Sequence, residues 1–487
     1  MKKTSIIAIS AALMIIVSAC DSVLDKNPYQ LVSSTGDSSD SIKYKTASLV
    51  ESAIAGCYSV LRNNEYYNLD LWVNAEMQSD NAYPGDNGGT EYQQIDKYSL
   101  TADNTQIARD WSDLYSFIGN ANTVIANVPK TTDAALTEAR RQQVIAEAKS
   151  LRGMFYFELV RLYGSVPLVT YETPTIEASK LEEIYPLLYP ARNTEAEIYN
   201  QVKKDLKDAI PYLTTSTTNK GIMSQTAAYS LLAKIYATVE PIKWDSVKYY
   251  CNLVTSNKSY GLLNNYNDLF KYGAEKNNKE MILTIPCDQA NGNWGYSMFI
   301  GTDWKKYGPP SNELLALFDS EGDAVRKSST VLYADVTGLW TDSKYTSDKY
   351  PLCYKLRTAS NDIILLRLAD IILLQAEAEN QLGNLGAAKS LVDEVRGRVG
   401  LSGTTALTKE DMTLAIEKER RLELAFEGHR WFDLKRTNRL KTVMDAFKYN
   451  GKYLYKGLVK ADKTNWIWPI PQTQLNLNSN LTQNPGY

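Results

Sequence analysis

The densest group of side chains that could do chemistry lies near the end of the chain, in the run ERRLELAFEGHRWFDLKR at residues 419–436. Paired carboxylates are what a glycoside hydrolase uses, one as general acid and the other as nucleophile or base. Here the acids alternate with arginines at spacings of three and four residues, which place opposite charges side by side on a helix. We therefore predict salt bridges on the helix surface and between helices, and no catalytic residues. The group comprises Glu419, Arg420, Arg421, Glu423, Glu427, Arg430 and Asp433.

Other reactive residues are scarce. His429 is the only histidine, so a histidine-rich zinc site or a histidine-based triad is hard to build. Its neighbours Trp431 and Phe432 favour a packing role. We expect no metal and no cofactor. Scattered cysteines without metal-ligand spacing could pair in an oxidising compartment, but we expect mostly buried single thiols; they are Cys57, Cys251, Cys287 and Cys353.

Composition points to a globular body with aromatic residues to spare. The chain is 44% hydrophobic and 22% charged, and its net charge of -3 gives no electrostatic case for nucleic acid. It has 33 tyrosines and 9 tryptophans against 9 phenylalanines. Tyrosine and tryptophan combine an apolar face with a polar group, which suits half-wet surfaces. Part of this surplus is therefore available for recognition.

Helical periodicity dominates the elements that must position these residues. The clearest helix is predicted over residues 137–163, where Val144, Ala148 and Leu151 begin a stripe on one face that Gly164 terminates. Further helices are predicted from about Thr46 and over residues 110–128, 196–213, 225–239, 365–382 and 387–399.

Small residues at helix crossings suggest stacked helix pairs. Residues 365–399 resemble a tetratricopeptide pair, with Gly383 at the turn, and residues 229–254 look like a looser copy. Between residues 261 and 364 the pattern changes to turn clusters and short alternating runs. The predicted fold is mostly α, with tetratricopeptide-like helix pairs as a scaffold and a loop-rich irregular layer containing short β-strands.

The N-terminus has the order of a secretory signal. A positive start and an apolar run lead to Val17-Ser18-Ala19-Cys20, which resembles a bacterial lipobox. Cleavage before Cys20 would leave a lipidated cysteine followed by a polar tether. The run is shorter than the roughly 20 residues of a membrane-spanning helix, and no later segment is long and apolar enough to span.

Several stretches in order along the chain resemble the SusD/RagB family of lipoproteins. They are VLDKNP at residues 23–28, LRGMFYFELVRLYGSVPLV at 151–169, RLAD at 367–370, the 419–436 run, and WPIPQ and NLTQNPGY at 468–472 and 480–487. The resemblance divides the chain into a signal peptide (1–19), a lipidated tether (20–45), a SusD-like N-terminal region (46–215), tetratricopeptide-like helices (216–260), and a C-terminal region (261–487) with a loop-rich insertion (261–364).

The resemblance implies a non-catalytic outer-membrane lipoprotein that faces the cell exterior and captures nutrient for a SusC-like TonB-dependent transporter. Most members of the family bind oligosaccharides, and a RagB-like branch binds peptides. Asp21, directly after the lipid cysteine, is associated in some bacteria with the inner membrane.

A sugar site needs flat aromatic faces together with amide and carboxylate groups for the hydroxyls. The loops at residues 72–89 and 291–304 offer this mixture. The candidate ligand residues are Trp72, Asp80, Asn81, Tyr83, Trp294, Tyr296 and Trp304, with Trp340 in reserve.

Three alternatives remain open. The ligand could be a peptide, the protein could be a surface glycoside hydrolase that uses Asp80 and Glu91, or it could be a scaffold that only holds the transporter. The sequence does not identify the glycan.

Overall fold

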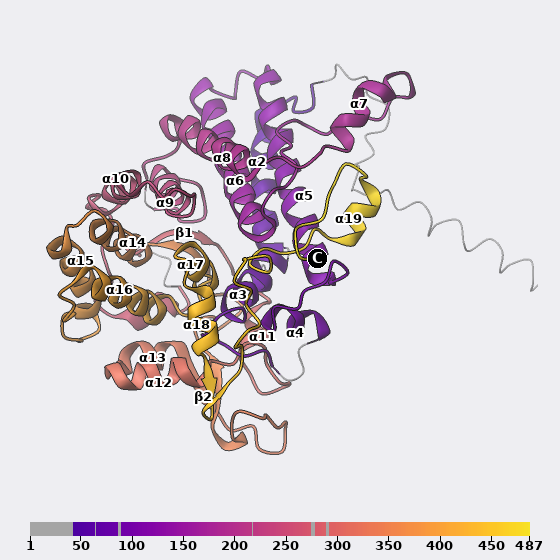
Figure 1. Ribbon diagram of the computed structural model, residues 1–487. Helices are drawn as coiled ribbons and strands as arrows, with labels where there is room; N and C mark the ends of the chain where they lie inside the picture. The colour runs from indigo at the N-terminus through magenta and orange to yellow at the C-terminus, as the bar shows by residue number, and fades with distance from the viewer. Residues whose placement is uncertain (1–41, 64, 86–88, 217, 274–277, 289–291) are drawn as a thin grey trace, which may run out of the picture. The chain divides into compact units, whose positions relative to one another are not determined.

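The long helix predicted over residues 137–163 is present as α6 (Glu138–Tyr163), which packs between α5 (Thr105–Asn127) and α8 (Glu195–Ala209) (Figure 1). It begins where the Thr137 hydroxyl accepts a hydrogen bond from the amide of Arg140, and it ends at Gly164, whose φ is +70°. Its second half is buried nearly all round, because neighbouring helices cover more than one face.

The computed structural model describes residues 42–487 except 64, 86–88, 217, 274–277 and 289–291. The predicted signal peptide and Cys20, and the tether up to residue 41, lie outside these residues. The described chain from Lys43 onward forms one compact unit. No helix in these ranges is long and apolar enough to cross a membrane.

Helices make up most of the regular structure, as predicted. The others are α2 (Ala47–Asn63), the π-helix η2 (Tyr66–Asp70), α3 (Leu71–Glu76), α4 (Thr90–Asp96), η3 (Val128–Lys130), η4 (Ala178–Lys180), α7 (Leu181–Leu188), η5 (Ile210–Tyr212), α9 (Gln225–Tyr236), α10 (Trp244–Thr255), η6 (Tyr266–Phe270), α11 (Tyr296–Phe299), α12 (Asn312–Glu321), α13 (Ala324–Thr330), η7 (Ser347–Lys349), α14 (Leu368–Gln381), α15 (Leu385–Arg398), α16 (Lys409–Leu424), α17 (Arg430–Arg436), α18 (Leu440–Ala446) and α19 (Gln472–Leu477).

The tetratricopeptide-like helix pairs are confirmed. Helices α9 and α10 pack against each other, α10 packs on α14, and α14 packs on both α15 and α16 (Figure 1). Ala376, Ala378 and Ala388 are fully buried on these helices, which lets the backbones approach closely. One boundary was predicted wrongly: residues 365–367 belong to a strand, and α14 begins at Leu368.

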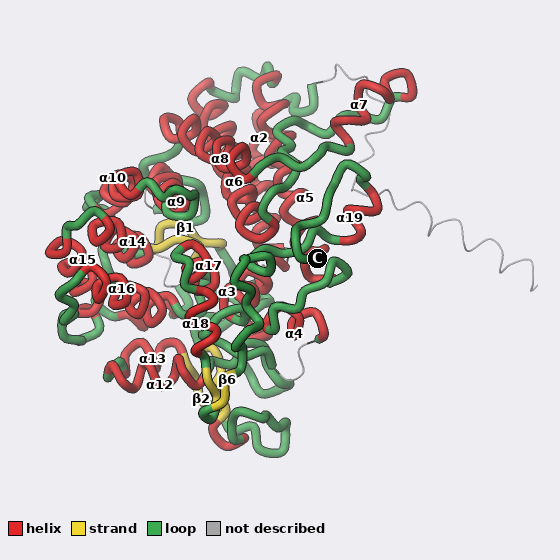
Figure 2. Tube along the Cα trace, in the orientation of Figure 1, coloured by secondary structure: helices red, strands yellow, loops and turns green. Residues whose placement is uncertain are grey.

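The loop-rich layer contains short antiparallel strand pairs, and Figure 2 shows loops predominating around β2 and β6. The pairs are β1 (Met281–Ile285) with β4 (Ile363–Arg367), β2 (Val331–Ala334) with β3 (Tyr350–Cys353), and β5 (Lys448–Tyr449) with β6 (Lys452–Tyr453). Met281 pairs with Arg367 and Ile285 with Ile363, so β1 holds residues 363–367 extended. The sequence did not predict α12 and α13, which begin at the capping side chains of Ser311 and Asp323.

The cysteines of the described chain are single thiols, as expected. Cys57, Cys251 and Cys353 are buried, Cys287 is half-buried, and all four are free. No group of histidine, cysteine or acidic residues able to hold a metal ion occurs in the part of the chain that the structure describes.

Candidate functional site

The two loops predicted to hold the ligand lie side by side. The amide of Ser311 donates to the carbonyl of Asn81 at 2.7 Å. A Cβ atom on Gly85 would lie 2.5 Å from the carbonyl oxygen of Lys306, so a larger residue would displace the backbone. The first loop is therefore fastened to the segment that follows the second.

Asp80 and Asn81 hold this junction from the inside, and both are buried. The Asp80 carboxylate accepts from Arg430 Nε at 2.7 Å and pairs with Arg421 Nη1 at 3.0 Å. The Asn81 amide donates to Glu76 Oε2 at 2.7 Å and accepts from Arg421 Nε at 3.0 Å. Because their polar groups are occupied within the protein, the structure gives no support to the prediction that they contact a ligand.

Trp72 and Tyr83 are also buried. The Trp72 ring packs against Phe299 with centroids 6.2 Å apart, and Tyr83 stacks on Phe447 at 5.8 Å. Both rings brace the loops and do not present a face to solvent. Trp340, the reserve candidate, is half-buried.

Among the predicted ligand residues, Trp304 has a partly exposed ring that packs against other aromatic rings. Its half-buried ring meets Tyr307 edge to face at 5.6 Å, and Tyr307, also half-buried, packs on Tyr92 at 4.9 Å. Tyr92 is only 7% exposed and supports Tyr307 from the protein side. We call Trp304 and Tyr307, with Tyr92 packed against Tyr307, the aromatic surface.

Sequence reasoning missed Tyr307 and Tyr92. Tyr307 follows Trp304 by three residues, so its nearness in the chain was a usable signal. Tyr92 belongs to α4, and only the packing of α4 against the segment that follows the second loop brings it to the site.

Lys306 fixes the orientation of Trp304. Its ammonium lies 4.1 Å from the centroid of the Trp304 ring and pairs with the carboxylate of Asp303. The Lys306 side chain is only 1% exposed, whereas that of Asp303 is 68% exposed. The ring is thus held in place by the protein itself, and a ring held in this way would lose less entropy on contact with a ligand.

Trp294 and Tyr296 flank a close backbone contact. A Cβ atom on Gly295 would lie 1.8 Å from the carbonyl oxygen of Asn68, so this turn rests directly on η2. Both aromatic rings pack against the hydrophobic core and remain partly exposed. They keep their place as predicted ligand residues.

A charged cluster supports Tyr92. Arg109 acts electrostatically on the Tyr92 hydroxyl, and its Nη2 donates to Asp70 Oδ2 at 2.7 Å. Asp70 acts electrostatically on the buried Asp110, which accepts from Asn74 Nδ2 at 2.9 Å. Burial, together with the neighbouring Asp70, raises the pKa of Asp110 well above its usual range. The closeness of two buried carboxyl groups therefore favours the protonated form of Asp110.

The charged run at residues 419–436 forms the predicted structural network. Arg367 Nε donates to Glu427 Oε2 at 2.6 Å, and its Nη1 contacts Glu423 at 2.5 Å and Glu280 at 3.0 Å. Lys355 joins Glu427 at 2.6 Å. These partners come from distant segments, whereas the spacing had suggested some contacts within one helix. The side chains of all five are at most 2% exposed, so the network lies inside the protein and not on the helix surface.

Two family models match the chain. One, described as the SusD family, matches residues 319–487, and the other, described as starch-binding associating with outer membrane, matches residues 23–237. The chain belongs to the SusD family.

Relatives and solved structures agree over nearly the full length. A SusD-like protein of Formosa agariphila is 27% identical, with 96% of this SusD-family chain and 97% of that protein aligned. A SusD superfamily protein of Bacteroides vulgatus has a TM-score of 0.77 at 20% identity, covering 91% of this chain and 100% of that one. A laminarin-binding SusD-like protein has a TM-score of 0.72 at 25% identity, covering 91% and 100%.

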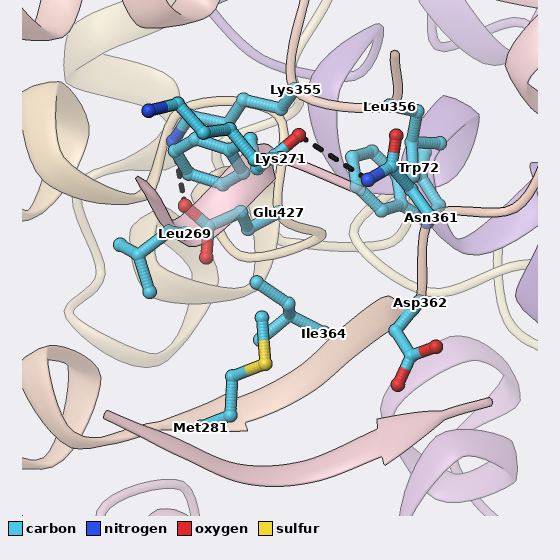
Figure 3. A pocket seen from close by; sticks show the side chains of 11 residues that line it. Trp72, Leu269, Lys271, Met281, Lys355, Leu356, Asn361, Asp362, Ile364 and Glu427 are labelled. Carbon is cyan, nitrogen blue, oxygen red and sulfur yellow. Dashed lines mark hydrogen bonds and ion pairs between the residues drawn. The ribbon is translucent and has the colours of Figure 1, made fainter. Parts of the chain in front are cut away.

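Two small pockets of this SusD-family protein have too little free space for a sugar. The first lies among Trp72, Lys355, Asn361 and Glu427 (Figure 3) and has space for water of about 10 Å³. The second adjoins it and has about 40 Å³. Such volumes hold one or a few water molecules. An open surface therefore suits a glycan better than either pocket does.

Asp80 is poorly placed for hydrolysis. Burial would raise the pKa of its carboxyl, but the guanidinium groups of Arg421 and Arg430 outweigh burial and lower that pKa to about 2. A carboxylate that is locked in salt bridges and 1% exposed neither donates a proton near neutral pH nor reaches a substrate.

His429 of this SusD-family chain gives a direct test of the buried network. Its Nδ1 lies 3.1 Å from the Lys234 ammonium, and burial, with that ammonium, lowers the His429 pKa to about 3. We expect the imidazole NMR signals of this sole histidine to stay at their neutral positions from pH 7 down to about 4. A midpoint near the ordinary value of about 6.5 would contradict the described contacts.

The same shift predicts the pH dependence of stability. The unfolded chain takes up a proton on His429 below about pH 6.5, whereas the folded chain does not until about pH 3. Stability is therefore lost as the pH falls through this window, by at most about 1.4 kcal/mol per pH unit from this residue. Denaturant titrations of His429→Gln should show a shallower decline.

Proposed function

We propose that this SusD-family chain is a non-catalytic, lipid-anchored protein of the outer membrane that faces the cell exterior and captures an oligosaccharide. It then passes the sugar to a SusC-like TonB-dependent transporter. Cys20 carries the lipid, and the aromatic surface of Trp304 and Tyr307 carries the sugar. Trp294 and Tyr296 extend the contact. The handover and the anchor rest on the family, and the binding surface rests on the structure.

The half-buried pair of Trp304 and Tyr307 is the observation that supports this proposal most. The two rings meet edge to face at an interplanar angle of 73°. Lys306 lies over the Trp304 ring, and Tyr92 packs against Tyr307. The axial C–H groups of a sugar ring form an apolar face that such aromatic rings cover. A laminarin-binding protein of the same fold supports a glycan as the ligand.

Calorimetry with Trp304→Ala tests the surface. We would titrate the protein with laminari- and malto-oligosaccharides. Other glycans would be screened on a glycan array. Losing one stacking ring at the centre of a binding surface should weaken the affinity at least about tenfold, or about 1.4 kcal/mol. The matched control is Trp244→Ala, another half-buried tryptophan, at the start of α10.

Each contrary result would point to a different function. Binding of peptides but of no glycan would indicate a peptide receptor. New reducing ends released by the pure protein would indicate a hydrolase. Unchanged glycan binding and import after the Trp304→Ala, Trp294→Ala and Tyr296→Ala substitutions would leave only a scaffold role for these loops.

A further inference from the structure

The cation closest to Tyr92 is already neutralised. Arg109 pairs with Asp70 at 2.7 Å and with Glu65 at 2.5 Å. The Arg109 side chain is 34% exposed and that of Glu65 is 41% exposed, so this ion pair reaches the surface. An anionic ligand at Tyr92 would compete with two carboxylates for one guanidinium.

The two lysines beside Trp304 are neutralised in the same way. Lys306 pairs with Asp303, and Lys305 Nζ lies 2.9 Å from Asp342 Oδ2. Both lysine side chains are at most 2% exposed, so neither ammonium extends toward a ligand. Positive charge is present here, but it is committed to the protein.

Further carboxylates remain without a salt bridge among the described residues. Burial raises the pKa of the Tyr307 hydroxyl, and the negative charge of Glu91, in the first turn of α4, raises that pKa further. Asp113 is half-buried beside Asp70 and Glu65, and burial and these two neighbours raise its pKa to about 6. Near neutral pH, acid therefore outweighs base around the aromatic surface.

We infer that the aromatic surface selects uncharged glycans, and that Glu65 and Glu91 are residues that exclude anionic ones. This inference rests on the proposed function. Carboxylates accept hydrogen bonds from sugar hydroxyls, so they favour a neutral, hydroxyl-rich ligand. They repel the carboxylate of a uronic acid and the sulfate of a sulfated sugar. Arg109, Lys305 and Lys306 are already paired with carboxylates, so these cations offset little of the repulsion.

A glycan array separates the inference from the proposed function. It should carry neutral, uronate and sulfated oligosaccharides and be probed with the wild type and Trp304→Ala. We expect the wild type to bind neutral oligosaccharides and Trp304→Ala to lose this binding. Anionic ligands that are lost in the variant would overturn the inference and leave the function standing. Absence of any ligand, or ligands that the variant retains, would overturn the proposed function and the inference with it.

A charge-neutralising pair tests the two glutamates. The test compares the neutral oligosaccharide that binds with its derivative oxidised to a carboxylate at C6. The derivative keeps the same linkage and differs in its negative charge. We expect Glu65→Gln/Glu91→Gln to raise the ratio of oxidised to neutral affinity at least about fivefold. The matched control, Glu182→Gln/Glu183→Gln, removes the same charge from exposed positions on α7 and should leave the ratio unchanged.

Ionic strength provides an independent readout. In 0.1 M salt the electrostatic interaction between exposed charges decays over a distance of about 10 Å, and this distance shortens as the salt concentration rises. The wild type should therefore bind the oxidised oligosaccharide better as salt rises from 0.02 to about 0.5 M, while its affinity for the neutral form stays constant. Weaker binding of the oxidised form at high salt would mean attraction, and would overturn the inference. An equal change of ratio in both glutamine pairs would do so as well.

Discussion

Arg367→Ala is expected to lower the unfolding free energy by roughly 3–5 kcal/mol. The guanidinium of Arg367 is 1% exposed and holds Glu280, Glu423 and Glu427 together. Removing it leaves these buried carboxylates short of a positive partner, and their desolvation is then uncompensated. Urea denaturation followed by circular dichroism measures the loss.

Arg439→Ala is the control for this prediction. Arg439 pairs with Glu417 at 2.8 Å, but its side chain is 33% exposed, so water compensates both charges after the substitution. We expect a cost of about 1 kcal/mol or less. Equal losses in the two variants would show that the buried network contributes no more than a surface pair.

Gly295→Ala is the second substitution with a large expected effect. The added Cβ would lie 1.8 Å from the Asn68 carbonyl oxygen, which is backbone and cannot rotate away. We expect a loss of roughly 1–3 kcal/mol, as for overpacked positions. The turn that carries Trp294 and Tyr296 must also shift, so glycan affinity should fall by at least about threefold. Thermal unfolding and calorimetry on the same sample measure both effects.

Gly119→Ala supplies a control of opposite sign. Gly119 lies within α5, and a Cβ there would meet nothing within 4 Å. Alanine favours a helix interior by roughly 0.5–1 kcal/mol over glycine, so this variant should be more stable than the wild type. If Gly295→Ala were equally harmless, the turn would not rest on η2 as described.

Much of the helical framework could be predicted from local sequence. Thr137 and Gly164 mark the two ends of α6 through capping and a positive φ, which depend on neighbouring residues only. The start of α14 could not be placed in this way. Residues 365–367 continue the apolar pattern of that helix, but pairing with β1, far away in the chain, holds them extended.

The candidate site was predicted by region and only partly by residue. Trp72 and Tyr83 stand in a loop-like stretch beside polar groups, as ligand residues do, yet the structure buries both. Tyr307 could have been found from its nearness to Trp304 in the chain, whereas Tyr92 joins the site only because α4 packs against Tyr307. Whether a face of an aromatic ring remains exposed depends on packing against residues far away in the sequence, and a local sequence pattern carries no information about those residues.

The alternating charges at residues 419–436 show the same division. Their type and spacing by themselves determined that opposite charges would pair and that the run is structural, and the motifs around them determined the family. The tertiary structure decided which charges meet: Glu423 pairs with Arg367 and Arg398, and Asp80 with Arg430. The physical reason is that periodicity and capping act over a few residues, whereas burial and ion pairing are set by segments that only the folded chain brings together.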